Sequence, residues 1–340
     1  MPATIKDVAQ SAGVSVATVS RVLNRLDVVS DATRQRVSDA AAKLGYIPHG
    51  GARSLSMRRT ECVGAILPDL HGEFFSELIR GIDRVARLKG QHLLLTPSHD
   101  HADELAAALR SMQGRADGVL VMSPHLDAEV LRRNLPSTMP AVLMNTPRHG
   151  TPYSSFLVDN HGGASSMVRH LWARGHRRIA MIAGPEGNFD ADERRRGFLE
   201  TLGKLAPRTN PLILRGDFTE ESGHRAGRQV AAMRSRPDAV FAANDTMAIG
   251  CLFALREARL EVPRDIALAG FDDIPVARYV HPPLTTVRVA IAELGEAAFE
   301  RLMRAIERRG QDKPSKQLLR TELVVRASCT SHSNKRRGNT

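Results

Sequence analysis

Three residues near the amino terminus have the side chains that recognition of DNA bases requires. Arg21 carries a forked guanidinium that can donate hydrogen bonds to base edges, and Val16 and Ala17 can pack against thymine methyl groups. All three fall within one short stretch whose apolar residues recur at helical spacing. Base recognition by these residues requires an element that places the helix in a groove of the duplex.

The pattern of residues 4–24 predicts two short helices joined by a tight turn. Thr4 and Asp7 suit the first turn of one helix, Gly13 breaks that helix, and Ser15 caps the second. Two helices joined by a turn containing glycine form a helix-turn-helix, and its second helix normally lies in the major groove. The predicted DNA contacts in this stretch are Thr4, Ser15, Val16, Ala17, Thr18, Ser20, Arg21 and Asn24.

Length, charge and cysteine content set limits on the class of protein. A chain of 340 residues has room for two or three structural units. Residues 1–60 carry a net charge of +5 out of the +11 of the whole chain, as expected of a module that faces phosphates, although a solvated basic face would look the same. The three cysteines are too few and too scattered for a disulfide framework or a zinc site. With neither a signal peptide nor a membrane-length apolar run, we expect a cytoplasmic protein with no membrane partner.

From residue 61 onward, short apolar stretches alternate with helical patterns. Strands are predicted at 62–68, 92–96, 118–122, 141–144, 179–183, 212–214, 239–242 and 266–270. Helices are predicted at 74–88, 102–112, 162–174, 193–202, 221–233 and 245–258. This alternation, which restarts after 155–159, predicts an α/β fold with two doubly wound subdomains. A ligand would then bind in the cleft at the carboxyl ends of the strands.

Motifs of enzymes are missing from the sequence. His161-Gly162-Gly163 is superficially like an oxyanion-hole loop, but there is no G-x-S-x-G motif to supply a nucleophile. The sequence contains no Walker loop, no G-x-G-x-x-G after a strand and no H-E-x-x-H, and the His residues lack metal-ligand spacing. We therefore expect no catalysis, no cofactor and no metal.

Several blocks of sequence closely resemble one known family. They are TIKDVAQSAGVS, ATVSRVLN, LGYIP and ARSL in the first 60 residues, and LWARGHRRIAMIAGP, ERRRGF, FAANDTMAIG, DIALAGFDD and PPLTTVR later on. Together they span nearly the whole chain, which resembles the lac repressor/galactose repressor family of bacterial transcription regulators. The resemblance implies a helix-turn-helix headpiece over 1–46, a hinge over 47–60, and a periplasmic-binding-protein-like core over 61–330.

The resemblance also implies how the core is divided. One subdomain would comprise about 61–160 and 290–320, and the other about 161–289 and 321–330, with three crossovers between them. A basic tail over 331–340 would be disordered. In the hinge, Leu55 occupies the position of the leucine that opens a minor-groove step, flanked by Ala52 and Arg53. Gly50 and Gly51 depart from the family pattern, so this segment is either a hinge that depends more on DNA and partner or a plain flexible linker.

Residues of the effector site follow partly from the resemblance and partly from their places after strands. Arg194 matches the ligand-clamping arginine, Asp272 the hydroxyl-accepting aspartate, and Asn244 and Phe218 further pocket positions. Phe74 and Phe75 match an aromatic wall, although Phe75 could equally belong to the helix core. Asn145, Asn188 and Asp190 are added because they follow strands, whereas Asp245 and Asp273 are expected to be helix caps. Asn188 stands where some members have a second arginine, which favours a sugar over a strongly anionic ligand.

The predicted function is a ligand-responsive transcriptional repressor that binds a pseudo-palindromic operator in double-stranded DNA. A homodimer would present two recognition helices, and a sugar-like effector in the core cleft would control operator binding. The tail lacks the apolar heptads of a tetramerising coiled coil. Two alternatives remain at this point, a solute-binding protein of a transport system and a DNA-binding regulator that activates or ignores ligands.

Overall fold

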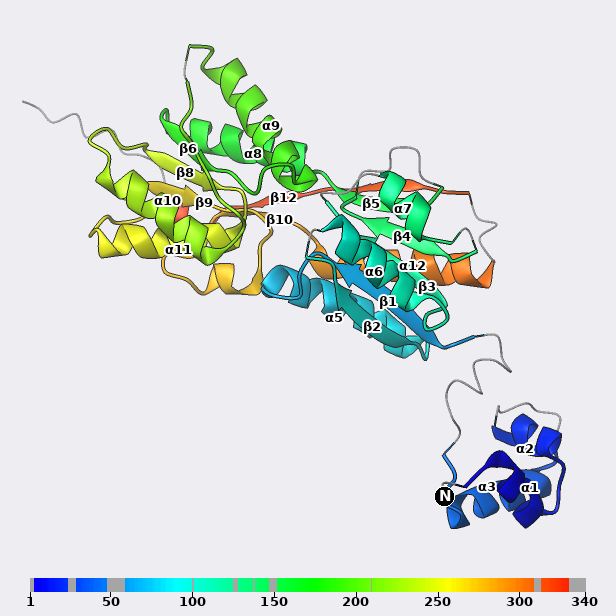
Figure 1. The fold of residues 1–340 in the computed structure, drawn as a ribbon. Helices are drawn as coiled ribbons and strands as arrows, with labels where there is room; N and C mark the ends of the chain where they lie inside the picture. Colours follow the sequence, from blue (N-terminus) through cyan, green and yellow to red (C-terminus); the bar gives the residue numbers. More distant parts are fainter. Residues whose placement is uncertain are drawn as a thin grey trace, which may run out of the picture.

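The computed structural model describes residues 3–23, 29–47, 59–99, 101–124, 128–136, 138–146, 152–208, 210–308 and 313–329. The amino-terminal unit is a bundle of three helices (Figure 1). They are α1 Ile5–Ala12, α2 Val16–Leu23 and α3 Asp31–Lys43. A small apolar core of its own, centred on Val8, Val19 and Val37, holds the three helices together.

Local sequence signals explain the corner between α1 and α2. Thr4 and Asp7 form the predicted capping box, in which each side chain accepts from the other residue's backbone N–H. Gly13 ends α1 with a φ of 63°, a left-handed conformation that favours glycine, and Ser15 Oγ accepts from Thr18 N–H at 3.1 Å. The spacing of Val37, Ala40, Ala41 and Leu44 predicts that all four face inward from a third helix; Leu44 instead is 38% exposed where α3 ends.

The first sheet of the core has six parallel strands in the order β11-β5-β4-β3-β1-β2. Its strands are β1 Cys62–Leu67, β2 His92–Pro97, β3 Gly118–Met122, β4 Ala141–Met144, β5 Ser154–Val158 and β11 Lys316–Leu319. Its helices are α5 Glu73–Leu88, α6 Ala102–Met112, α7 Ala128–Asn134 and α12 Ile291–Glu307. Because β1, β3, β4 and β5 lie inside the sheet with both faces covered, their residues are almost completely buried and, apart from Ser154 and Ser155 of β5, mostly apolar.

The second sheet has four parallel strands in the order β7-β6-β8-β9. Its strands are β6 Ile179–Ile182, β7 Ile213–Leu214, β8 Ala239–Ala242 and β9 Ala267–Ala269. Its helices are α8 Asn160–Ala173, α9 Phe189–Leu205, α10 Glu220–Ala232 and α11 Asp245–Glu257. The expected α/β class with two doubly wound sheets is therefore confirmed.

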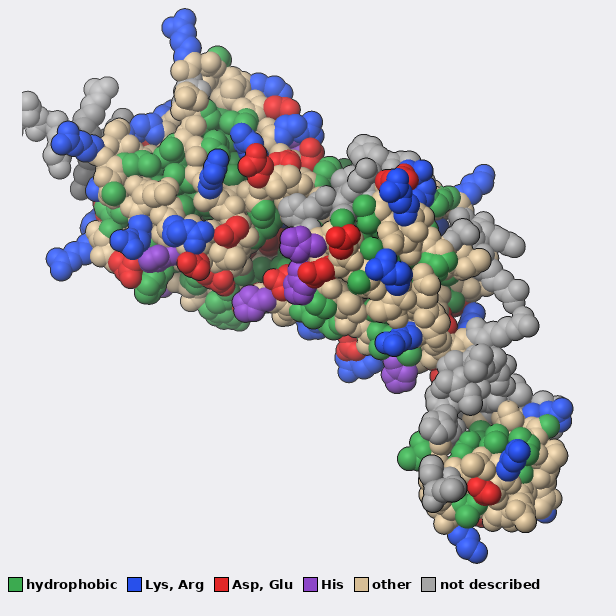
Figure 2. Space-filling view, in the orientation of Figure 1, with side chains coloured by type: hydrophobic (Ala, Val, Ile, Leu, Met, Phe, Trp, Pro, Cys, Tyr) green, Lys and Arg blue, Asp and Glu red, His purple; other side chains and the backbone are tan. Residues whose placement is uncertain are grey.

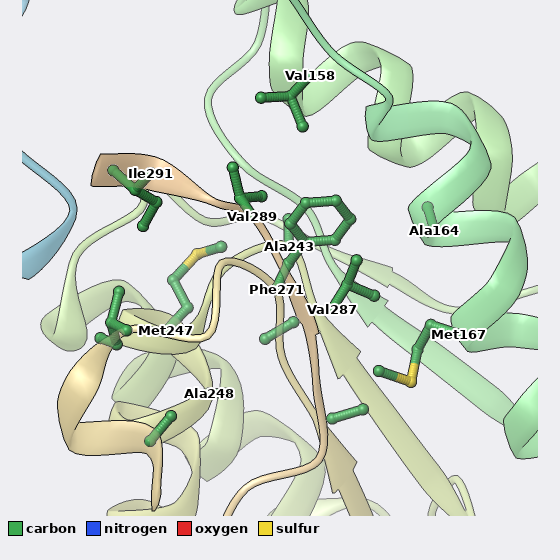
Figure 3. Close-up of a cluster of buried hydrophobic side chains, with 14 of the residues drawn as sticks. Val158, Ala164, Met167, Ala243, Met247, Ala248, Phe271, Val287, Val289 and Ile291 are labelled. Atoms are coloured by element: carbon green, nitrogen blue, oxygen red, sulfur yellow. The ribbon is translucent and has the colours of Figure 1, made fainter. Parts of the chain in front are cut away.

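The chain crosses between the two sheets three times, after β5, after β9 and after β11. Two crossing segments pair as antiparallel strands, β10 Thr286–Arg288 and β12 Glu322–Val324, near the short 3-10 helices η1 Pro275–Arg278 and η2 Ala327–Cys329. Figure 3 shows buried apolar side chains of this crossing region, with Val287 and Val289 beside Phe271 and Ala243. One apolar cluster thus continues from one sheet to the other.

Some elements differ from the sequence-based expectation. Helix α9 begins at Phe189 rather than at 193, because Asn188 accepts hydrogen bonds from the backbone of Asp190 and Ala191. Helices α7 and α12 and strands β10, β11 and β12 were not predicted. All except α12 are seven residues long or shorter, and short segments give little periodic signal. Helix α12 is 17 residues long, so shortness does not explain why it was missed.

Helices α10 and α11 approach so closely that glycine is required at their contact. A Cβ atom added at Gly250 would lie 1.9 Å from the carbonyl oxygen of Glu220. We expect Gly250→Ala to lower the free energy of unfolding by about 1–3 kcal/mol, since the backbone must shift to admit the methyl group. Gly203→Ala in α9 is the control, because nothing lies within 4 Å of the added atom there. It should leave stability unchanged or raise it by up to about 1 kcal/mol. Urea unfolding of both variants tests this, and equal stabilities would contradict it.

Candidate functional site

The outer face of α2 carries the residues predicted to read DNA. Ser15, Val16, Ala17 and Arg21 are exposed, with Val16 at 42%, while Thr18 and Ser20 are half-buried. The opposite face of α2 is fixed by Val19 and Val22 in the small core of the bundle. The helix therefore presents an apolar patch followed one turn later by a guanidinium, a combination that suits a major groove containing thymine and guanine.

The remaining predicted DNA contacts lie outside the described residues. They are Asn24, Ala52, Arg53 and Leu55. Thr4 is described, and its hydroxyl and backbone N–H both donate to Asp7 Oδ2 at 2.8 Å. Any contact of Thr4 with a phosphate would therefore be made at the start of α1, next to this capping box.

A buried polar cluster lies between the two sheets, and Arg194 is at its centre. Arg194 is 3% exposed, and its Nε donates to Asn160 Oδ1 at 2.8 Å while Nη1 donates to the carbonyl of Ala243 at 2.6 Å. Its Nη2 lies 3.0 Å from Asp272 Oδ1 as an ion pair. The guanidinium carbon also lies 3.9 Å from the ring centroid of Phe271, a cation–π distance. The chain thus fixes the guanidinium on several sides.

Asp190 belongs to the same cluster, and two asparagines hold it there. Asn160 Nδ2 donates to Asp190 Oδ1 at 2.7 Å, so Asn160 bridges Asp190 and Arg194. The Asn145 side chain, from the end of β4, also hydrogen-bonds the Asp190 carboxylate. Asn160 was not predicted as a site residue. Its place two residues after the end of β5 is the signal that could have identified it, because the same reasoning selected Asn145.

Other predicted residues have structural roles at the edge of this cluster. Asn188 caps α9, and Asn244 caps α11 by accepting from Met247 N–H at 2.9 Å while donating to the carbonyl of Phe218 at 3.0 Å. Phe218 lies 5.8 Å from Arg194, measured from ring centroid to guanidinium carbon. Phe74 and Phe75 are half-buried in the first turn of α5, with their rings edge to face at 5.4 Å.

Three residues at the site have backbone conformations that side chains rarely adopt. Asn145, Phe218 and Asp272 have φ values of 45°, 71° and 109°. Such positions cost about 1–3 kcal/mol each and occur most often at binding sites. The peptide groups of Asp272 are nonetheless fixed, since its N–H donates to Val287 and its carbonyl accepts from Val289.

The expectation that Asp245 and Asp273 are helix caps is wrong. Asp245 is the first residue of α11, where Asn244 is the cap, and its carboxylate instead accepts from the Thr286 hydroxyl at 2.6 Å and from Ile274 N–H at 3.0 Å. Asp273 accepts from Arg288 Nε at 2.7 Å and from Arg326 Nη2 at 2.5 Å. Both carboxylates thus join the crossing strands to the second sheet. The sequence could not show this, because the partners lie 15 to 53 residues away.

Burial raises the pKa of both Asp190 and Asp272 to about 6, although Arg194 acts in the opposite direction. Their usual value is 3.8, so the folded state holds more protons than the unfolded chain between about pH 4 and 6. This pair therefore stabilises the fold less as the pH rises through that range.

From this we expect Asp190→Asn to stabilise the protein at pH 7.5 and to have little effect at pH 4. At low pH the wild-type carboxyl group is already neutral, so the substitution removes no charge there. Urea unfolding at both pH values measures the difference, with exposed Asp192→Asn on the same helix as the control. An effect of the same size at both pH values would contradict this prediction.

Segments that flank the two sheets are in direct contact around the cluster. The Phe189 N–H donates to the carbonyl of Pro124 at 3.1 Å, and Glu73 Oε2 accepts from Val276 N–H at 3.0 Å. A cavity of about 650 Å³ lies elsewhere, at the amino ends of β4 and β5, where Tyr153 and Arg301 are among its lining residues. The conformation described here is thus closed over the predicted site, and a ligand would have to separate some of these contacts.

Comparisons with known proteins agree with this arrangement of units. Residues 4–49 match the model for bacterial regulatory proteins of the lacI family, and residues 168–329 match that for a periplasmic binding protein-like domain. The HTH-type transcriptional repressor PurR of Photorhabdus laumondii is 36% identical over 319 residues, covering 91% of this chain and 92% of that protein. The HTH-type transcriptional repressor CytR of Escherichia coli K12 is 36% identical over 332 residues, covering 96% of each.

Solved structures show the same similarity. The lac repressor dimer bound to operator and the anti-inducer ONPF has a TM-score of 0.85 at 30% identity, covering 97% of this chain and all of that one. The complex of the regulator CelR with cellobiose has a TM-score of 0.70 at 32% identity, covering 96% and 99%.

Fold, site and relatives together define a transcriptional repressor with a helix-turn-helix DNA-binding domain and a ligand-binding core. The chain belongs to the lacI family of bacterial regulatory proteins. It is therefore not an enzyme, and the alternative of a solute-binding protein for transport does not apply. Within the described residues, no helix is long and apolar enough to span a bilayer.

Proposed function

We propose that the protein binds a pseudo-palindromic operator as a homodimer and that a sugar or sugar derivative, bound in the core, changes its operator affinity. The observation that carries the proposal is the buried cluster of Asn145, Asp190, Arg194 and Asp272 between the two sheets. Carboxylates and a guanidinium are the groups that recognise hydroxyls in a small concave site. The structure of the regulator CelR in complex with cellobiose supports the same ligand class.

The position of the cluster suggests how ligand and DNA are coupled. Asn145 comes from the first sheet, whereas Asp190, Arg194 and Asp272 come from the second. A ligand that contacts both sheets binds one relative orientation of the sheets more tightly than the other. In a dimer, the change in orientation alters the separation of the two headpieces, and the coupling free energy acts in both directions.

The homodimer rests on its own observations. The lac repressor that matches over 97% of this chain is a dimer on its operator. In this chain β2 is an edge strand of the first sheet, and Leu95 within it and Leu88 at the end of α5 are 39% and 82% exposed. A second copy would cover such a surface. Sedimentation at micromolar concentration should give a dimer, and a tetramer or monomer would contradict this assignment.

The experiment begins with selection of an operator from random duplex DNA by the full-length protein. Thermal unfolding is then measured with sugars, sugar acids and nucleobases. A ligand at one hundred times its dissociation constant should stabilise the core by about 2.7 kcal/mol. Each hit is tested for its effect on binding of the selected operator.

The outcomes separate the possible functions. A sugar that shifts both the unfolding curve and operator affinity supports the proposal. A nucleobase that does so instead would overturn the ligand class. Operator binding that no compound changes would favour a regulator that ignores ligands. Selection of a duplex without two-fold symmetry would contradict the pseudo-palindromic operator.

A further inference from the structure

The buried cluster has more hydrogen-bond acceptors than donors. Within the described residues, Asn145 Oδ1 and Asp272 Oδ1 are buried and accept no aligned hydrogen bond. The contact of Asp272 Oδ1 with Arg194 at 3.0 Å is an ion pair without that alignment. Asn145 is 1% exposed and Asp272 is 5% exposed, so bulk water does not satisfy these oxygens.

Most donors of the cluster are already engaged, and the remaining one, Arg194 Nη2, faces Asp272 Oδ1 at 3.0 Å as an ion pair. Arg194 donates to Asn160 and to the carbonyl of Ala243, while Asn160 and Asn145 both donate to Asp190. A buried acceptor without a donor is unfavourable, so a ligand that brings donors is favoured at this site. The missing groups are therefore N–H or O–H groups of a ligand rather than further acceptors.

The formal charge of the cluster points in the same direction. Asp190 and Asp272 supply two negative charges, and Arg194 supplies one positive charge. The neighbouring Asp273 is neutralised by Arg288 and Arg326. Asp245 is also buried nearby, where its carboxyl group accepts from the Thr286 hydroxyl and the Ile274 N–H. Burial raises the pKa of Asp245 well above its usual value, so this residue is not counted as a negative charge. Asn188 stands where some members of the family have a second arginine, and its side chain carries no charge.

This negative character is local to the site. Lys, Arg, Asp and Glu side chains are interspersed on the visible face of the core, without a large region of one sign (Figure 2). The whole chain carries a net charge of +11, so it does not attract cations in general. Any preference for a positive ligand must therefore come from Asp190 and Asp272 themselves.

We propose that the effector is a donor-rich, positively charged sugar derivative, namely a sugar with a protonated amine, held between Asp190, Asp272 and Asn145. The inference rests on the proposed function and specifies the ligand class of the same site. An ammonium group has three donors and no acceptor, so it satisfies several orphaned oxygens at once and balances the excess negative charge. A sugar acid would add acceptors and place another negative charge beside Asp190 and Asp272, so this proposal excludes sugar acids as the effector.

The test uses the full-length protein and matched sugars that differ at one group. Glucosamine, galactosamine and mannosamine are compared with glucose, galactose and mannose, and with glucuronate and galacturonate, by titration calorimetry at pH 7. We expect at least one amino sugar to bind at least about tenfold more tightly than its neutral counterpart, a difference of about 1.4 kcal/mol. The sugar acids should not bind detectably.

Two variants locate the source of the preference. Asp272→Asn removes one negative charge and adds a donor. The affinity for the amino sugar should then be within about threefold of the affinity for its neutral counterpart. Asp192→Asn makes the same change at an exposed position of α9 and should retain the full advantage of the amino sugar. Circular dichroism of both variants ensures that they are folded.

Each result decides the proposal. A neutral sugar or a sugar acid that binds as tightly as the amino sugar overturns it, and so does a panel in which no amino sugar binds. An unchanged preference in Asp272→Asn removes that residue from the charge recognition. Operator binding is measured separately, so a neutral sugar that releases the operator would leave the proposed function intact while rejecting the amine.

Discussion

Replacement of Arg194 by alanine should destabilise the core by about 3–5 kcal/mol at neutral pH. The substitution leaves Asp190 and Asp272 buried without a counter-charge, and it removes the donors to Asn160 and the Ala243 carbonyl. This loss of free energy of unfolding should be smaller near pH 5, because both carboxyl groups can then become neutral by binding protons. Urea unfolding followed by the fluorescence of Trp172, the only tryptophan of the chain, measures both values.

Arg195→Ala is the matched control for this variant. Arg195 is the next residue of α9 and is exposed, so its removal should change the free energy of unfolding by less than about 0.5 kcal/mol. An Arg194→Ala protein as stable as Arg195→Ala would show that the ion pair with Asp272 contributes nothing to the fold. A deficit that is equal at pH 5 and pH 7.5 would show that the two carboxylates are not its cause.

Arg21→Ala should abolish sequence-specific operator binding and leave ligand binding by the core intact. A bidentate contact with a base contributes about 1–3 kcal/mol, and the proposed dimer would lose two of them. Non-specific DNA binding should decrease only slightly, since it depends on contacts with phosphates. Fluorescence anisotropy with the selected operator and with a scrambled duplex, at the same salt concentration, gives the ratio of the two affinities.

The control for this effect is Arg36→Ala. Arg36 is exposed on α3, so this variant loses the same charge from the same headpiece without changing α2. It should retain the ratio of specific to non-specific affinity. If Arg21→Ala retains that ratio as well, α2 is not the element that reads the bases through Arg21.

Much of the headpiece could be predicted from the sequence because its signals are local. The capping box of Thr4 and Asp7, the left-handed Gly13 and the inward-facing Val19 and Val22 depend on neighbours within a few residues. The alternation of strands and helices in the core could be predicted for a similar reason, because buried parallel strands are continuous apolar runs. The boundaries shifted where a single side chain decided them, as with Asn188 at the start of α9.

Sequence by itself thus determined the order of the elements and the residue types available at the strand ends. Only the tertiary structure decided which of those residues meet. Arg194 and Asp272 are 78 positions apart, and Asn145 and Asp190 come from different sheets, so no periodicity could pair them. The same holds for Asp245 and Asp273, whose partners belong to the crossing strands. Hydrogen bonds and ion pairs act over a few ångströms in space, and at this site the three crossings of the chain set those distances.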